Sequence, residues 1–306
     1  MHEVTCHRVE EHRIARALED IWSRSFAQWH GVRYGDGLLN ELLILADDLV
    51  DHVAACSTQD PTLSGASEQL ALRTAAECAL GVLTIGCFPG GDFGVPFPLI
   101  DEELTSEDMD LTDAVDLAPT ARTWVDAFRL CVVSGVLGEW KRAIGLVMRK
   151  DYAPAIHKGL PYSRLTSVSD PAELVEMDVL CRYLTPSPGH LPRDWPVVTV
   201  RKPDGDERRE AARCLDALSA LTPDQLLLRV LLEDDQPAFE QALAGRLVQH
   251  REGASADAAP RSLLPLGALA PAALAVQVHG WQLHLRSGYL PHGLLHALDK
   301  APQARS

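Results

Sequence analysis

The sequence lacks the features of a membrane or secreted protein. No stretch reaches the roughly 18 uninterrupted apolar residues that a membrane-spanning helix needs. The first twenty residues are polar and amphipathic, without the apolar core and small-residue cleavage site of a secretory signal. We therefore expect a cytoplasmic protein with no membrane partner.

Paired cysteines are also missing. Seven cysteines are scattered along the chain, and no two form a Cys-x-x-Cys pair. Most lie among apolar residues in segments that look helical, which is typical of buried, reduced thiols rather than of disulfides or a zinc site.

Basic residues are few. The chain has 28 Lys and Arg against 43 Asp and Glu, a formal net charge of −15. Such a charge repels the phosphate backbone, so we expect no nucleic-acid partner, and it suits a basic protein partner. Solubility alone is the simpler explanation of the same charge.

Sequence motifs of common enzyme classes are absent as well. The chain has no Gly-x-Ser-x-Gly elbow, Walker A loop, dinucleotide fingerprint or His-Glu-x-x-His zinc motif. Its glycine-rich stretch, Gly90–Gly94, precedes a proline-rich run instead of a helix, and this indicates a turn rather than a phosphate-binding loop.

What the chain does have is helical periodicity. Apolar residues recur at spacings of three and four over 9–29, 38–56, 68–87, 120–134, 139–149, 170–184, 207–221, 222–233 and 237–251. We expect an all-α protein of antiparallel helical hairpins, packed in an α-solenoid or tetratricopeptide-like array, with at most a short hairpin or strand piece.

Two segments rich in helix breakers interrupt this pattern. Phe88–Ile100 holds three glycines and three prolines and predicts an extended arm or a small hairpin. Residues 185–205 hold five prolines around a short strand-like piece, Val197–Val200. We interpret them as a long loop within a single domain, 1–306, and keep 185–205 as a candidate boundary between two domains.

An acidic block follows the first of these segments. Residues 101–116 contain eight acids and no base, so mutual repulsion should keep them at the surface. We predict that this block binds a partner through Glu102, Glu103, Glu107, Asp108, Asp110 and Asp113.

Two further clusters raise the alternative of an enzyme. Asp47, Asp48 and Asp51 match the Asp-Asp-x-x-Asp pattern that holds magnesium and a diphosphate in class I terpene synthases and prenyltransferases. The chemistry also requires a second acidic motif facing the first, and none is evident. A solvated helix face is the competing interpretation.

The twelve histidines include His2, His7 and His12 near the start of the chain and a C-terminal group of His279, His284, His292 and His296. Only His292 and His296, four residues apart, can share a helix face. A transition metal held by such histidines is the other enzyme alternative, but surface or hydrogen-bonded histidines are the better explanation.

The C-terminal region resembles a known family. Leu266–Ala270 with the Ala/Leu helix after it, then Ser287–Pro291 with Leu294 and Leu295, resembles the C-terminal signature of the immunity protein 49 family. Residues 235–251 are similar to its penultimate helix, and Trp124–Phe128 to its central helix. Members of that family are bacterial, largely actinobacterial, and are assigned to polymorphic-toxin systems.

The resemblance implies a cytosolic protein that binds and neutralises a cognate toxin and uses no cofactor. It carries no catalytic residues, so none are assigned. The alternatives are the magnesium-dependent and histidine-ligated enzymes described above. The sequence does not define an oligomeric state.

Overall fold

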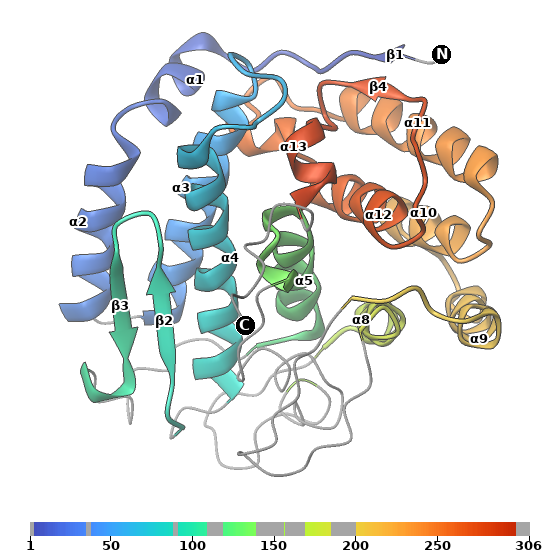
Figure 1. Ribbon diagram of the computed structural model, residues 1–306, viewed down its shortest axis with the longest axis horizontal. Helices are drawn as coiled ribbons and strands as arrows, with labels where there is room; N and C mark the ends of the chain where they lie inside the picture. Colours follow the sequence, from blue (N-terminus) through green and yellow to red (C-terminus); the bar gives the residue numbers. More distant parts are fainter. Residues whose placement is uncertain are drawn as a thin grey trace, which may run out of the picture.

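The first part of the fold is a layer of consecutive helices. The structure is a computed structural model and describes residues 3–34, 38–87, 91–108, 119–138, 156, 169–184 and 200–297. Helices α2 and α4 pack on either side of α3, and the short α1 crosses its end (Figure 1). Their bounds are α1 Glu11–Ala17, α2 Ile21–Tyr34, α3 Leu38–Cys56 and α4 Ala66–Cys87.

The prediction of one helix over 9–29 was wrong, because the chain turns between Ala17 and Ile21. Asp20 starts the second helix, since its carboxylate accepts hydrogen bonds from the backbone N–H and the hydroxyl of Ser23, at 3.2 and 2.6 Å. Arg24 fixes the corner by donating to the carbonyl oxygens of Arg16 and Glu19.

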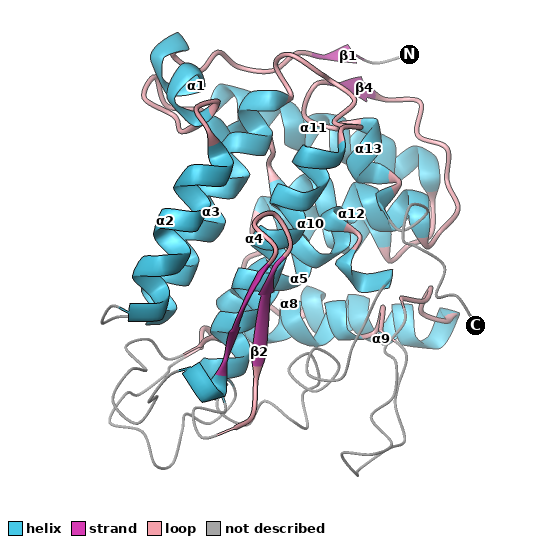
Figure 2. Cartoon of the chain, turned by 60° about the vertical axis from the view of Figure 1, so that its left-hand side comes forward, coloured by secondary structure: helices cyan, strands magenta, loops and turns pink. Residues whose placement is uncertain are grey.

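The breaker-rich segment after α4 forms the small hairpin that was one of the two predicted options. Strand β2 (Gly94–Phe97) pairs antiparallel with β3 (Glu102–Thr105), and the one-turn helix η1 (Ser106–Asp108) follows. Val95, Phe97 and Leu104 are buried, and β2 contacts α4 (Figure 2). The hairpin turn is fastened to α4 by Thr74, whose hydroxyl oxygen accepts a hydrogen bond from the Leu99 N–H at 3.0 Å.

The second part of the fold begins with α5 and η2 and then adds helices in pairs. Helix α8 packs on α5 and on α9, and α10 and α11 form the tight helical hairpin predicted from Thr222-Pro223 and Asp234–Gln236. The bounds are α5 Ala121–Ser134, η2 Val136–Gly138, α8 Pro171–Cys181, α9 Gly205–Asp216, α10 Pro223–Leu231 and α11 Gln236–Glu252.

Predicted caps explain several of these helix starts. At the start of α8, the Asp170 carboxylate accepts a hydrogen bond from the Ala172 N–H, and Pro171 occupies the first helical position. At the start of α10, Thr222 and Gln225 form a reciprocal capping box. The predicted partner helix of α5, over 139–149, lies outside the described residues, as does the strand-like piece before Val200; Val200 itself forms an isolated bridge with Leu184.

Helix α12 (Leu266–Gln277) closes the array. It follows the 3-10 turn η4 (Pro260–Leu263) and packs on α5, α10, α11 and the short α13 (His292–Leu295). Residues from Gly267 to Ala275 are buried throughout, whereas Val276, Gln277 and Val278 are partly buried, so the small-residue part of the helix lies in the core. The all-α array is confirmed too, and its last long helix returns to the middle of the chain instead of extending the row.

One connected cluster of buried apolar side chains runs from Val4 to Leu295. Within the described part, α4 is the one helix long and apolar enough to cross a membrane by composition, and 78% of its apolar window is buried inside the protein. Its place between α3, α5 and the hairpin is that of a core helix.

The N-terminal segment packs on a strand that precedes α13. Strand β1 (Glu3–Val4) pairs in parallel with β4 (Arg286–Ser287), and the Ser287 hydroxyl donates to the Val4 carbonyl at 2.7 Å. The two short strands lie side by side at the top of Figure 1.

Candidate functional site

The acidic block begins on the outer strand of the hairpin. Glu103 and Glu107 are exposed and Glu102 is half-buried. Residues of a strand alternate between its two faces, so Glu102 shares a face of β3 with the buried Leu104, and Glu103 lies on the opposite face. Asp108 ends η1, while Asp110 and Asp113 lie outside the described residues. The described geometry thus places three of the six predicted partner-binding carboxylates around one edge of the hairpin.

A surface hollow lies beside this hairpin. It is open to solvent, measures about 760 Å³, and lies between the start of α2, the end of α3, the start of α4 and the turn between β2 and β3. Trp22 lines it and is 49% exposed. The apolar pattern over 9–29 places Trp22 and Phe26 on one helix face with Ile21 and Trp29. In the structure Trp22 and Phe26 are exposed, and the buried side of α2 consists of Ile21, Ser25, Trp29 and Val32.

The floor of the hollow contains a histidine and a cysteine. His52 donates through Nδ1 to the Ala17 carbonyl at 2.9 Å, which leaves Nε2 as acceptor for the Cys56 thiol at 3.5 Å. Burial, with smaller contributions from the nearby carboxylates Glu68 and Asp60, raises the pKa of Cys56 to about 11. The thiol is therefore protonated at neutral pH and is a poor nucleophile.

The three aspartates of the Asp-Asp-x-x-Asp pattern face arginines. Asp48 binds Arg24 through both oxygens, at 3.0 and 3.1 Å. Asp51 accepts from the backbone N–H and the guanidinium of Arg261, both at 2.7 Å, and Asp47 lies 3.2 Å from the same guanidinium. These pairs join α3 to α2 and to η4.

Histidines near the two chain ends form one hydrogen-bonded group. The Ser262 hydroxyl donates to the Ala259 carbonyl at 2.6 Å, so it can accept from His7 Nε2 at 2.8 Å. His7 Nδ1 then accepts from the Tyr289 hydroxyl at 2.7 Å. Burial lowers the pKa of His7, and the neighbouring His250 lowers it further. A neutral His7 thus holds the N-terminal segment against the C-terminal region.

His279 belongs to a second group, at the other end of α12. Its fully buried ring contacts the Asp234 carboxylate through Nδ1 at 2.8 Å and the Tyr183 hydroxyl through Nε2 at 3.1 Å. Lys202 and Arg208 also bind Asp234, at 2.7 and 3.1 Å. Burial lowers the pKa of His279, although the bond to Asp234 opposes the shift. This group ties three loops together.

The remaining C-terminal histidines have simple environments. His292 and His296 stack at 4.3 Å between ring centroids, as their spacing predicted, and His284 is exposed beside Glu240. Among the described residues, no group of three or more His, Cys, Asp and Glu side chains is arranged to hold a metal ion.

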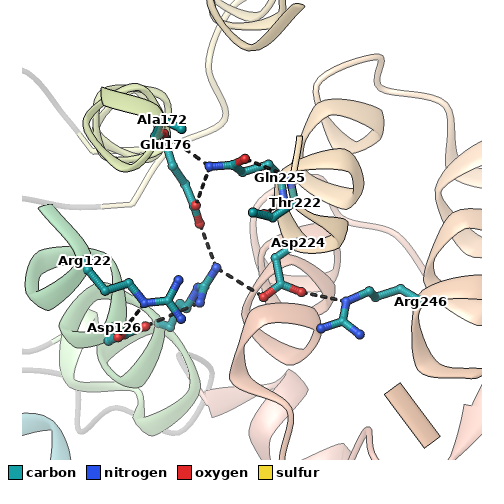
Figure 3. A network of polar contacts seen from close by, with 9 residues as sticks. Arg122, Asp126, Ala172, Glu176, Thr222, Asp224, Gln225 and Arg246 are labelled. Atoms are coloured by element: carbon teal, nitrogen blue, oxygen red, sulfur yellow. Dashed lines mark hydrogen bonds and ion pairs between the residues drawn. The ribbon is translucent and has the colours of Figure 1, made fainter. Parts of the chain in front are cut away.

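A buried ionic network, not anticipated from the sequence, links four helices (Figure 3). Arg129 of α5 binds Glu176 of α8 at 2.7 Å and approaches Asp224 of α10 at 3.5 Å. Gln225 donates to Glu176 at 3.2 Å, and Arg246 of α11 donates to Asp224 at 2.7 Å. The spacing of Thr222 and Gln225 is typical of a capping box. No local sequence pattern indicates that Arg129 pairs with Glu176, 47 positions away.

These contacts define an all-α protein that exposes an aromatic and acidic face, while its aspartate and histidine clusters join distant segments. Comparison with known proteins identifies its family. The family model described as immunity protein 49 matches residues 60–294, well over half of the 306 residues. The chain therefore belongs to the immunity protein 49 family, and membership indicates an immunity protein of a toxin system. No curated protein and no solved structure matches the chain.

Proposed function

We propose that this protein binds a cognate toxin domain of a polymorphic-toxin system and neutralises it in the cytoplasm of the cell that produces it. The observation that carries the proposal is the family match over residues 60–294. Neutralisation by binding requires neither a cofactor nor a catalytic residue.

The toxin surface in contact is proposed to be basic. The net charge of −15 favours such a partner and opposes binding to nucleic acid. Glu102, Glu103, Glu107, Asp108, Asp110 and Asp113 are proposed to form part of the contact. Exposed carboxylates of this kind speed the encounter, while desolvated apolar and aromatic side chains supply most of the affinity.

Co-expression tests the function. The toxin domain encoded beside the gene is induced in a host strain with and without this protein, and an inactive form of the toxin serves for purification. We expect growth to be restored and the two proteins to purify as a complex. Growth arrest that persists despite soluble, folded immunity protein would refute the proposal.

A further inference from the structure

Two aromatic side chains of α2 present a flat apolar surface to solvent. Trp22 and Phe26 stack with their ring centroids 5.4 Å apart and their planes within 5° of each other. Phe26 in turn contacts the buried Trp29 at 5.5 Å, so the stack is anchored in the core. Exposed apolar surface of this kind commonly marks a binding site.

The hollow beside Trp22 continues this surface onto two other elements. Leu70 of α4 and Leu99 of the hairpin turn also line it. We call this region, between α2, α4 and the hairpin turn, the α2–α4 hollow. It lies beside the turn of the hairpin, whose strand β3 carries Glu102 and Glu103.

The charged side chains that line the hollow are carboxylates. Its lining in the described chain includes the carboxylates of Glu19, Asp20 and Glu68 and contains no lysine or arginine. Hydrogen bonds from Ser23 lower the pKa of Asp20, which keeps that carboxylate ionised. Glu68 and Asp60 are close enough to raise the pKa of the Cys56 thiol beyond the effect of burial. A cation is therefore favoured at this site.

An aromatic wall beside carboxylates suits a guanidinium better than an ammonium. The planar guanidinium stacks on an indole and binds carboxylates with two parallel hydrogen bonds. The same helix already shows this contact, because the guanidinium of Arg33 lies 5.4 Å from the ring centroid of Trp29. A second copy of this chain would be a poor occupant, since it would bring a net charge of −15 against the same charge.

We propose that the α2–α4 hollow receives an arginine-bearing segment of the toxin, with the guanidinium over Trp22 and facing Glu19 and Glu68. This inference rests on the proposed function and assigns it a docking site. Glu68, Leu70 and Leu99 belong to the segment that the family model matches, residues 60–294, whereas Trp22 lies before that segment in the sequence. The hollow therefore combines residues inside and outside the matched segment.

Variants of the aromatic residue Trp22 and of the acidic residue Glu68 test the proposal. Their affinity for the inactive toxin domain encoded beside the gene is measured. We expect Trp22→Ala to raise the Kd about 10- to 100-fold, as for an aromatic anchor at an interface centre. Glu68→Gln should raise it several-fold at low salt and less at high salt. Matched controls are Leu226→Ala, an apolar residue 52% exposed on α10, and Glu252→Gln at the end of α11; both should bind within about twofold of wild type.

Each outcome has a separate meaning. Wild-type binding by both Trp22→Ala and Glu68→Gln would overturn the docking site and leave the neutralising function intact. Equal weakening by Leu226→Ala would also overturn it, as would a self-associated wild-type protein that Trp22→Ala converts to a monomer. If the wild-type protein does not bind the toxin domain at all, the proposed function and the docking site both fall. Trp22→Phe, which keeps an aromatic face, should restore most of the affinity.

Discussion

Arg129 and Glu176 are 2.7 Å apart in a region almost closed to solvent, with 7% and 5% of their side chains exposed. Removing both ions from water is costly, and their mutual attraction offsets this cost only while the pair is complete. The second oxygen of Glu176 accepts from Gln225, and Asp224 Oδ2 lies 3.5 Å from the same guanidinium nitrogen of Arg129 that binds Glu176. The network therefore specifies how α5, α8 and α10 meet.

Breaking this pair should be strongly destabilising. Arg129→Met leaves Glu176 buried without its cation, and we expect a loss of about 3–5 kcal/mol in the free energy of unfolding. The double variant Arg129→Met/Glu176→Leu should lose much less than the sum of the two single variants. The surface pair Arg122–Asp126, about half exposed, is the control, and Arg122→Met should cost about 1 kcal/mol or less. Urea unfolding measures all four variants, and additive losses would contradict the coupling.

A glycine of α12 is required by the same network. A Cβ atom at Gly267 would lie 1.8 Å from Asp224 Oδ2, and Asp224 cannot retreat without losing Arg246. We expect Gly267→Ala to destabilise the fold by about 1–3 kcal/mol. A Cβ atom added at Gly245 of α11 would meet no neighbouring atom of the described chain within 4 Å, so Gly245→Ala should instead stabilise the helix by about 0.5–1 kcal/mol. Thermal melts of the two variants should shift in opposite directions.

The ion pairs of Asp47, Asp48 and Asp51 predict a weak response to magnesium. Arg24 already pairs with Asp48, and Arg261 with both Asp47 and Asp51, so millimolar Mg²⁺ should leave the Tm unchanged. Asp51→Asn should cost about 1–2 kcal/mol of stability, because it weakens two hydrogen bonds from Arg261. A magnesium-dependent rise in Tm that Asp51→Asn abolishes would favour the diphosphate-enzyme alternative.

His7 should make stability depend on pH near neutrality. Its pKa is lowered in the folded state, so the unfolded chain takes up a proton first as the pH falls. Neutral His7 therefore contributes fully to the stability of the fold at pH values above its ordinary pKa of 6.5. This contribution is lost as the pH falls below 6.5 toward the lower pKa of the folded state. We expect a lower Tm at pH 5 than at pH 7, and a smaller decrease in His7→Gln. His12→Gln, on an exposed ring, should behave like wild type.

The acidic hairpin should act mainly on the rate of toxin association. Replacing Glu102, Glu103 and Glu107 with Gln should slow association about tenfold at low ionic strength and little at about 1 M salt, where charges are screened. Glu210→Gln with Glu252→Gln, which removes acids on α9 and α11, is the control. Stopped-flow mixing with the inactive toxin domain gives the rates, and a triple variant as fast as wild type would exclude this surface.

Local signals in the sequence predicted the helices well where caps and periodicity agree. Thr222-Pro223, Asp170-Pro171 and the apolar pattern of 38–56 locate α10, α8 and α3 to within a few residues. All the C-terminal residues that resembled the family, except Leu295, lie in the segment that its model matches. These features depend on residues close together in the chain, so they can be predicted from the sequence.

Features that depend on distant contacts were not predictable. The apolar pattern of α2 includes Trp22 and Phe26, which are exposed, and omits Ser25, which is buried. Apolar residues that recur with the helical period of 3.6 define an apolar face. When two such faces overlap, the period does not indicate which of them packs on the neighbouring helices. The contact of His7 with Tyr289 spans 282 positions, and no spacing rule reaches that far.

The parallel pairing of β1 with β4 has a consequence for synthesis. During translation Glu3 and Val4 leave the ribosome long before their partners Arg286 and Ser287. Helices α1 to α4 can assemble earlier as a unit, but β1 has no partner strand until β4 emerges. A chain truncated before Arg286 would lack that partner however well its helices formed. Pairing of β1 therefore reports that translation has passed Ser287.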